Sequence, residues 1–278
     1  MNNLELNTKS IGKQHIWLEQ TDSTNEVIKR LLRDGQTIEG EAGRISRMIE
    51  GSIHNGLVVI ADHQTHGKGR SGREWQDEIG SNIAMSILLQ PGLKAESLSM
   101  LTLVSAMAVA KTIKDMTGFE ALIKWPNDVI IGGRKVCGIL TELELAAGHY
   151  CVVVGIGINV NQAYIPEELS DKATSLLNES DGLVPYDREK IVVSVLENFE
   201  EYYEKFCEVG NMSELMYEYN SILVNRNEQV RVLDPANGME GVSRGIDDMG
   251  RLLVETEDGD WHHIYAGEVS VRGVYGYV

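Results

Sequence analysis

Apolar and polar residues alternate up to residue 226 in a pattern that predicts short strands separated by a few helices. Apolar runs of about four to eight residues, bounded by turn residues, are typical of strands. The later runs are separated only by Gly132-Gly133 and by an AAGH turn, and strands joined so closely pair antiparallel. The pattern therefore predicts an α+β fold with a mixed, largely antiparallel sheet flanked by helices. The strand-like runs occupy residues 14–20, 57–61, 83–90, 121–125, 128–143 and 150–160.

A first helix is predicted at residues 22–35, where the apolar side chains share one helical face and a glycine ends the pattern. Ser23 and Glu26 form the S-x-x-E pattern of a capping box. On this pattern alone, Ser23, Thr24 and Asn25 are interpreted first as residues that begin a helix.

Two longer helices are predicted further along the chain. Residues 98–117 are so strongly apolar, up to Gly118, that this helix is expected to lie buried against the sheet. Asp187 is expected to cap a long amphipathic helix. The apolar positions of this last helix repeat at helical spacing and are interpreted as core contacts. They are Ile191, Val195, Phe199, Tyr202 and Phe206.

The pattern of apolar runs and turns changes near residue 226. Five short strand-like runs follow, separated by the turns DPANG, DDMG and EDGD. About fifty residues with this spacing are typical of a small β-barrel. We therefore expect two domains, a larger one at residues 1–226 and a C-terminal barrel at residues 227–278.

Composition indicates the kind of partner and the cellular compartment that suit this chain. The 278 residues carry a formal net charge of −17, so the chain is a poor non-specific binder of nucleic acid and local cation clusters stand out. The three cysteines have no paired spacing, which favours reduced thiols in a cytosol. The N-terminus does not resemble a signal peptide, and no apolar run approaches the roughly 20 residues of a membrane helix. We expect a cytoplasmic protein without membrane contact.

Residues 62–73, DHQTHGKGRSGR, combine glycines with the cations Lys68, Arg70 and Arg73 directly after an apolar run. The glycine spacing satisfies G-x-G-x-x-G, but a dinucleotide-binding loop must open a helix, and here another strand-like run follows. The composition instead suits a basic loop that closes over an anionic ligand. A solvated hairpin with incidental charge is the alternative.

Two further segments carry candidate chemistry. Lys124 and Asp128 flank a Trp-Pro-Asn turn, and Lys135 follows on the returning strand, which could serve phosphates and a magnesium ion. A turn can also bring lysine and aspartate together without catalytic purpose. In GIGIN, Asn159 offers both a donor and an acceptor, as an adenine edge requires, but it could equally satisfy backbone groups at a strand end.

Five segments occur together and in one order: STN at 23–25, ADHQTHGKGRSGREW at 61–75, KWPNDV at 124–129, GRKVCGIL at 133–140 and GIGINV at 155–160. This set strongly resembles bacterial biotin protein ligases, which activate biotin with ATP and attach it to a lysine of a carrier protein. The resemblance extends over about residues 14–273. It implies a class II synthetase-like catalytic domain that binds biotin and ATP, followed by an SH3-like barrel.

The resemblance also implies a biotin site. Lys135 would be the cation at the biotin carboxylate and the α-phosphate, and Arg70 would belong to the loop that folds over biotin and the adenylate. These two are the implied catalytic residues. The implied biotin-binding residues are Ser23, Thr24, Asn25, Gln64, Lys68, Gly69, Arg70, Lys135, Gly138 and Leu140.

For the nucleotide, the resemblance implies contacts from Arg73, Trp75 and Lys124, with Asn159 at the adenine. Asp128 would hold Mg²⁺. The implied intermediate is biotinyl-5′-AMP, a mixed anhydride that a closed loop would protect from water. The implied partner is a biotin carboxyl carrier protein domain of a carboxylase, and a homodimer is compatible with the family.

The sequence departs from the family pattern at several points. Lys68 replaces a frequent arginine, Ser71 replaces a further cation of some members, and residues 38–56 are longer than the usual connection. About 14 residues precede the first strand, too few for the DNA-binding domain of members that act as repressors. We therefore expect no DNA binding. A lipoate ligase or octanoyl transferase of the same superfold is the alternative, and the GKGRSGR, KWPND and GRKVCGIL set favours the biotin branch.

Overall fold

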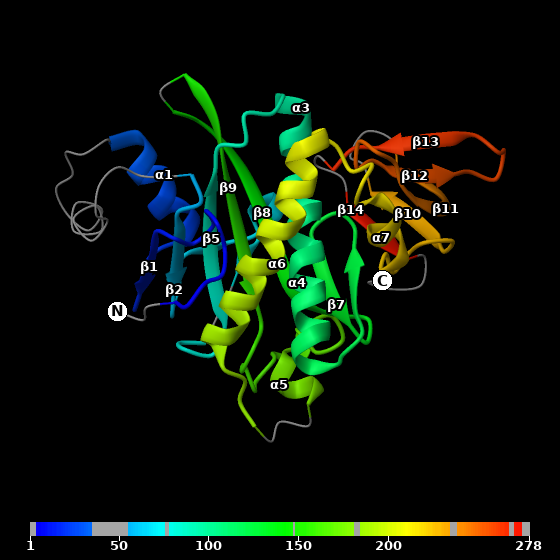
Figure 1. Cartoon of the computed structure of the whole chain (residues 1–278). Coiled ribbons are helices and arrows are strands. Elements are labelled where there is room, and N and C mark those ends of the chain that lie inside the picture. Colours follow the sequence, from blue (N-terminus) through cyan, green and yellow to red (C-terminus); the bar gives the residue numbers. More distant parts are fainter. Residues whose placement is uncertain are drawn as a thin grey trace.

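The computed structural model describes residues 4–34, 55–75, 78–146, 148–180, 184–233, 238–266 and 270–273. Two large sheets and a two-stranded hairpin organise these residues. A seven-stranded sheet carries helices on both faces, and a five-stranded sheet built from the C-terminal residues lies beside it (Figure 1). The long connection at residues 38–56, which the sequence singled out, lies almost wholly outside the described residues.

The large sheet has the strand order β1-β2-β5-β9-β8-β7-β6. β1 (His15–Leu18) runs parallel to β2 (Val58–Ala61), and all other neighbouring pairs in this sheet are antiparallel. The prediction of a mixed, largely antiparallel sheet is therefore confirmed. The remaining strands are β5 (Ile83–Leu89), β6 (Ala121–Lys124), β7 (Asp128–Ile131), β8 (Arg134–Ala146) and β9 (His149–Ile158).

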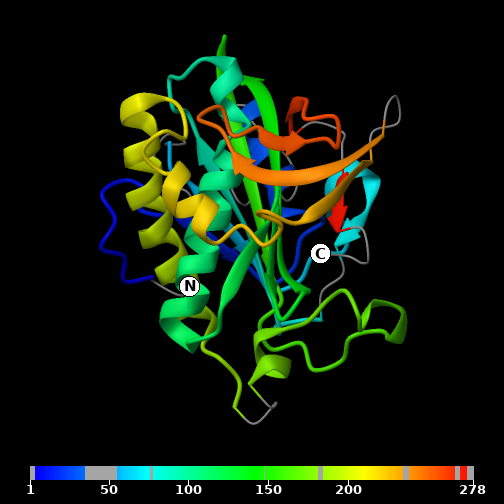
Figure 2. The same cartoon turned by 90° about the vertical axis from the view of Figure 1, so that its right-hand side faces the viewer.

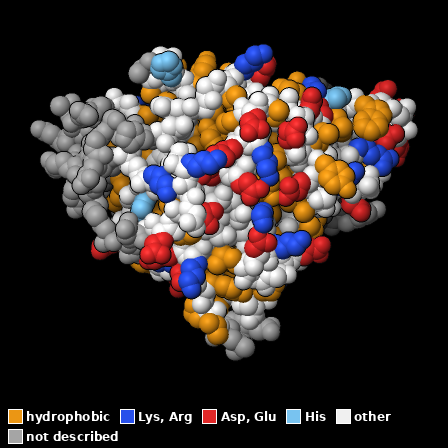
Figure 3. Space-filling view, in the orientation of Figure 1, with side chains coloured by type: hydrophobic (Ala, Val, Ile, Leu, Met, Phe, Trp, Pro, Cys, Tyr) orange, Lys and Arg blue, Asp and Glu red, His pale blue; other side chains and the backbone are white. Residues whose placement is uncertain are grey.

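One face of this sheet is covered by α4 (Leu101–Thr117) and α6 (Arg188–Val209), which cross in front of the strands in Figure 1. The core contacts expected along α6 are all buried, and Asp187 caps the helix by accepting a hydrogen bond from the Lys190 N–H. Both sequence predictions are confirmed. The outer surface of this layer carries acidic and basic side chains close together (Figure 3).

α3 (Ala95–Leu98) precedes α4, and together residues 95–117 are long and apolar enough to span a membrane by length and composition. The sequence analysis had excluded such a run. However, 78% of the 18-residue window in this stretch is buried inside the protein, because α4 packs between the sheet and α6. A helix buried in this way is a core helix. The statement that no apolar run approaches the length of a membrane helix was therefore wrong, whereas the prediction of a helix buried against the sheet is confirmed.

The opposite face is covered by α1 (Thr24–Asp34), whose apolar stripe contacts β2, β5 and β9. The hydrogen bonds of the predicted capping box are replaced by other contacts. The Ser23 N–H donates to Asp22 at 2.7 Å, and the Glu26 carboxylate lies 2.6 Å from the amines of both Lys29 and Lys68. Lysines compete for Glu26 more strongly than a backbone N–H because they carry a full charge.

The glycine-rich stretch forms a hairpin on this same face. β3 (Gly67–Lys68) pairs with β4 (Glu74–Trp75) around the 3-10 turn η1 (Arg70–Gly72), and the chain then enters β5. In the part of the chain described between the hairpin and β5 no α-helix opens, which agrees with the rejection of a dinucleotide-binding loop. A second 3-10 turn, η2 (Glu167–Leu169), and the short helix α5 (Leu176–Glu179) lie in the connection from β9 to α6.

The C-terminal residues form an antiparallel sheet of order β13-β12-β11-β10-β14. The Trp125 indole N–H donates to the carbonyl of Gly250 at 3.1 Å, and the Asn220 side chain of α7 (Met216–Ser221) both donates to and accepts from Ile246. These bonds attach the small sheet to the large one. Its strands are β10 (Gln229–Leu233), β11 (Met239–Ile246), β12 (Leu252–Glu255), β13 (Trp261–Ile264) and β14 (Ser270–Gly273).

Candidate ligand-binding site

A pocket of about 50 Å³ opens on the α1 face of the large sheet, between α1, the glycine-rich hairpin and strands β5, β8 and β9. It brings together residues from all five segments quoted in the sequence analysis, although Asn159 of GIGINV and the charged residues of KWPNDV are not in its lining. The lining residues that the sequence singled out are Ser23, Thr24, Asn25, Gln64, Lys68, Trp75, Lys135, Gly138 and Leu140.

Polar groups gather at the α1 end of this pocket. The Gln64 side-chain oxygen accepts a hydrogen bond from the Thr24 N–H at 2.8 Å and lies 3.1 Å from the Thr24 hydroxyl. Beneath them, the fully buried Ser86 hydroxyl lies 2.6 Å from Thr24 Oγ1 and 2.5 Å from Asn25 Oδ1. A ligand with several hydrogen-bonding atoms on a small ring would find matching groups here.

The floor of the pocket is made of glycine backbone. A Cβ atom at Gly157 would lie 2.7 Å from the Trp75 ring, and one at Gly155 would lie 2.5 Å from Asn25 Oδ1. Only glycine allows these side chains to lie directly on the strands. Trp75 thus occupies part of the pocket, and its indole N–H is buried without a hydrogen-bond partner among the described residues.

Lys135 faces the pocket because β8 contains a bulge. Val129 pairs with Cys137 and Ile130 pairs with Lys135, so Val136 is an extra residue in β8. Since strand side chains alternate between faces, regular pairing would have turned Lys135 toward α4. The bulge instead brings its amine across Gly138, to within 2.7 Å of Asp128 Oδ1.

Lys124, whose pKa responds to Lys135, is the centre of a further group of cations. Burial lowers the pKa of Lys124 to about 8; Asp128 opposes this shift, and the nearby charges of Lys135, Arg272 and Arg73 add to it. Like charges are held this close only at a cost, which a bound polyanion would remove. Sequence reasoning missed Arg272, because it lies on β14 and only the docking of the small sheet brings it here.

Arg70 joins the hairpin to the rest of the protein. Its guanidinium donates to Asn127 Oδ1 at 2.8 Å and to the Ala266 carbonyl at 3.2 Å, so the hairpin, cyan in Figure 2, reaches the C-terminal sheet. Burial lowers the pKa of Arg70 from its usual value. Arg70 lines a second cavity of about 320 Å³ beside α3 and β8. The Gly69 N–H closes the turn by donating to the carbonyl of Arg73 at 2.7 Å.

Asn159 is buried behind the pocket rather than in its lining. Its side-chain N–H donates to the Thr174 carbonyl at 2.9 Å, and its backbone carbonyl accepts from the Leu176 N–H at 3.0 Å. These contacts match the alternative interpretation, in which Asn159 satisfies backbone groups at a strand end. Its predicted contact with adenine stays a prediction.

Asp128 is the carboxylate that the sequence assigned to a metal. Within the described ranges, no group of three or more His, Cys, Asp or Glu side chains could hold a metal ion. Asp128 also accepts from the Asn127 amide at 3.1 Å and pairs with Lys135. One carboxylate fits a magnesium ion that is held mainly by nucleotide phosphates, as is usual for this cation.

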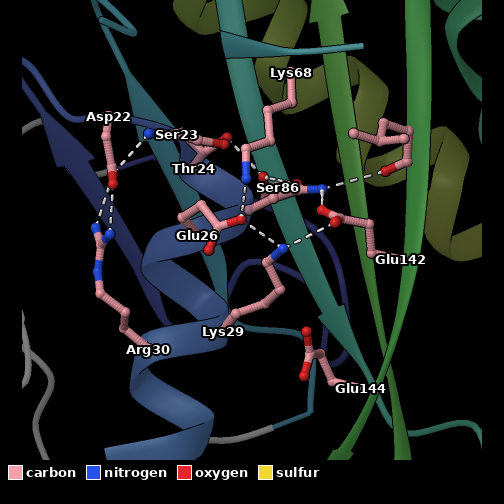
Figure 4. A network of polar contacts seen from close by, with 12 residues as sticks. Asp22, Ser23, Thr24, Glu26, Lys29, Arg30, Lys68, Ser86, Glu142 and Glu144 are labelled. Carbon is pink, nitrogen blue, oxygen red and sulfur yellow. Dashed lines mark hydrogen bonds and ion pairs between the residues drawn. The ribbon is translucent and has the colours of Figure 1, made fainter. Parts of the chain in front are cut away.

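A charged network that the sequence did not reveal extends from the hairpin to the pocket (Figure 4). Glu26 bridges Lys68 of the hairpin and Lys29 of α1, and Lys29 reaches Glu142 of β8 at 2.8 Å. Glu142 in turn accepts from the Asn25 amide at 2.7 Å. Glu26 and Lys29 have only the i,i+3 spacing of an ordinary helical surface pair, and their other partners come from strands distant in sequence.

Comparison with known proteins gives the class of this protein. Residues 43–159 match the Biotin/lipoate A/B protein ligase family, and residues 227–272 match the Biotin protein ligase C terminal domain. The biotin–[acetyl-CoA-carboxylase] ligase of Mycobacterium tuberculosis is 33% identical over 226 residues, which cover 79% of this chain and 81% of that protein. The chain therefore belongs to the biotin protein ligase family, as the resemblance indicated.

Other relatives agree. The bifunctional ligase/repressor BirA of Bacillus subtilis is 36% identical over 220 residues, which cover 78% of this chain but only 66% of that protein. The biotin protein ligase from Aquifex aeolicus in complex with biotin and ATP has a TM-score of 0.78 at 33% identity, covering 94% of this chain and 99% of that one. The apo structure of the same Aquifex protein has a TM-score of 0.72.

Proposed function

We propose that this protein is an ATP-dependent biotin protein ligase, which converts biotin to biotinyl-5′-AMP and transfers the biotinyl group to a lysine of a biotin carboxyl carrier protein domain. One observation carries the proposal. A single pocket holds the polar groups of Thr24, Asn25 and Gln64 at one end and the Lys135 amine at the other. Biotin has the same distribution of polarity, with a ureido ring at one end and a carboxylate at the other.

In the first half-reaction, a carboxylate oxygen of biotin forms a bond to the α-phosphorus of ATP, and the bond from that phosphorus to pyrophosphate breaks. Two anions must approach each other, so positioned cations lower the barrier. Lys135 lies at the carboxylate end of the pocket, and the charges of Lys135, Arg272 and Arg73 all act on Lys124. Asp128 would help to hold a magnesium ion bound with ATP, which would supply neutralisation of phosphate charge.

In the second half-reaction, the carrier lysine attacks the acyl carbon and AMP leaves. Before that, water must be kept from the mixed anhydride. The hairpin supplies the cover, because Arg70 holds it to Asn127 and to the carbonyl of Ala266. Trp75, which lies over Gly157, would move to admit the ligand and then contact the nucleotide.

The remaining assignments follow from this proposal. Residues 1–226 would form the catalytic domain and residues 227–278 the SH3-like domain, with Arg272 as a contribution of the latter to the phosphates. A cytoplasmic location and a biotin-accepting carboxylase domain as partner fit the chemistry, which consumes ATP and needs a protein lysine.

The test is biotin-dependent exchange of pyrophosphate into ATP by the purified protein, repeated with lipoate and with octanoate. We expect exchange with biotin and magnesium only, and labelling of a carrier domain on lysine. Exchange with lipoate or octanoate but not with biotin would contradict the proposal and favour the alternative branch of the family.

A further inference from the structure

The polar end of the pocket is fixed by a buried cation. The side chain of Lys29 is 7% exposed and contacts Glu26 at 2.6 Å and Glu142 at 2.8 Å. Burial opposes the charge of Lys29, but its hydrogen bonds to these carboxylates outweigh burial and raise its pKa. Lys29 therefore stays protonated and offers only donors to Glu142.

The charge of Glu142, with the more distant Leu140 carbonyl at 3.4 Å, determines which way the Asn25 amide points. One carboxylate oxygen of Glu142 receives Lys29, and the other lies 2.7 Å from Asn25 Nδ2. A carboxylate only accepts hydrogen bonds, so the amide must present its N–H to Glu142 and its oxygen to the other side. The other side is the hydroxyl of Ser86, 2.5 Å away.

The direction of the next two hydrogens follows from that orientation. Asn25 Oδ1 only accepts, so the single hydrogen of the Ser86 hydroxyl is donated to Asn25. Thr24 Oγ1 lies 2.6 Å from Ser86 Oγ, and this short contact then requires the Thr24 hydroxyl to donate to Ser86. The Gln64 oxygen, 3.1 Å away, also accepts from the Thr24 N–H and has a second lone pair for the hydroxyl. A Thr24 hydrogen directed there would leave two hydroxyl oxygens facing each other at 2.6 Å with no hydrogen between them. Thr24 has no hydrogen left for a ligand, and its lone pairs are available on the pocket side.

We propose that Glu142, held by Lys29, is a positioning residue that makes Thr24 a hydrogen-bond acceptor and so selects a ligand carrying an N–H donor at this end of the pocket. The inference rests on the proposed function, in which this donor is an N–H of the biotin ureido ring. Lipoate and octanoate carry no N–H group, so the same arrangement disfavours them.

Glu142→Gln tests the idea because it preserves size. Lys29 would still demand an acceptor and would hold the new amide oxygen, which turns the new N–H toward Asn25. The Asn25 amide must then flip and donate to Ser86. This reverses the direction of the hydrogen bonds from Asn25 to Thr24, so that Ser86 donates to Thr24. We expect the KM for biotin in the exchange assay to rise about tenfold, while the KM for ATP stays within about twofold.

Two companion variants separate positioning from simple loss of a contact. Glu144→Gln is the matched control, because Glu144 lies two residues along β8 and pairs with Arg33 at 3.0 Å, away from Asn25. The double variant Asn25→Asp/Glu142→Gln restores the original direction, since the introduced carboxylate accepts from both the introduced amide N–H and the Ser86 hydroxyl. We expect it to bind biotin within about threefold of wild type and more tightly than either single variant.

Biotin affinity is measured by titration calorimetry, and exchange kinetics are measured in parallel, for the wild-type protein and for each variant. An unchanged biotin KM in Glu142→Gln, or a double variant no better than Asn25→Asp, would overturn the inference while wild-type exchange leaves the proposed function intact. Wild-type protein that neither binds biotin nor catalyses exchange would instead overturn the proposed function, and the inference with it.

Discussion

The same strands of the seven-stranded sheet build the hydrophobic core on one face and the ligand pocket on the other. On the α4 and α6 face, alternate residues such as Met85 of β5 and Ile156 of β9 are fully apolar and buried. On the α1 face, their immediate neighbours Ser86 and Gly157 are small or polar. Because strand side chains alternate, adjacent positions serve stability on one face and ligand binding on the other.

The α1 face is itself divided. Where α1 covers it, the strands present apolar residues such as Leu88 and Val153, which pack against Ile28. Beyond the start of α1, the same strands present Ser86 to Thr24 and Asn25, and Gly155 to the pocket. The comparison teaches that the site is a local change in a continuous sheet, so its residues can be altered with little effect on the core.

The largest expected effects come from two neighbouring residues on β9. Ile156→Ala should lower the free energy of unfolding by about 2 to 5 kcal/mol, because it leaves a cavity in the core. Gly157→Val should instead abolish measurable exchange, because its side chain would fill the pocket where a Cβ already meets Trp75 at 2.7 Å. Chemical denaturation and exchange assays on both variants provide the check. Similar losses of stability in the two would refute the division between the faces.

A smaller effect is expected at the charged end of the pocket. Lys135→Ala should reduce exchange about a hundredfold at saturating biotin and ATP, since a charge-assisted contact to the developing transition state contributes on the order of 3 kcal/mol. Lys114→Ala, at an exposed position of α4, is the control and should retain wild-type turnover. Turnover that is the same in the two variants would mean that Lys135 is only a surface partner of Asp128.

The smallest effect should appear in the pH dependence of ATP binding. Burial, with help from neighbouring cations, lowers the pKa of Lys124 to about 8. The folded protein therefore loses this positive charge as the pH rises through about 8, and the KM for ATP should rise with it. Lys124→Arg remains charged over this range and should flatten the profile between about pH 7 and 9. Identical profiles would show that Lys124 does not meet the phosphates.

Periodicity predicted most of this fold. The apolar runs gave the strands, and the helical repeat of Ile191, Val195 and Phe199 gave α6 with its cap at Asp187. These elements are predictable because their burial depends on neighbours a few residues away. The antiparallel pairing of β7, β8 and β9 followed from short turns, for which closure leaves few alternatives.

The site was less predictable, because it depends on register and on distant partners. The bulge at Val136 sends Lys135 to the pocket face, and regular alternation would have placed it in the core. Lys29 and Glu142 are 113 residues apart in the sequence, and neither has an unusual local pattern. The motifs supplied candidate residues, whereas the strand register decided which of them meet.

The glycine floor also limits how this pocket can change during evolution. At Gly155 and Gly157 the surface that meets a ligand is main chain, which is the same in every protein whatever its side chains. Substitutions there can only shrink the pocket, so a lineage adapting to another acid would have to alter the walls, at Thr24, Asn25 or Gln64. Chemists designing inhibitors face the reverse situation. Compounds that contact mainly the backbone of the floor should keep their affinity when side chains change. Compounds that contact the side chains of the walls should distinguish one family member from another.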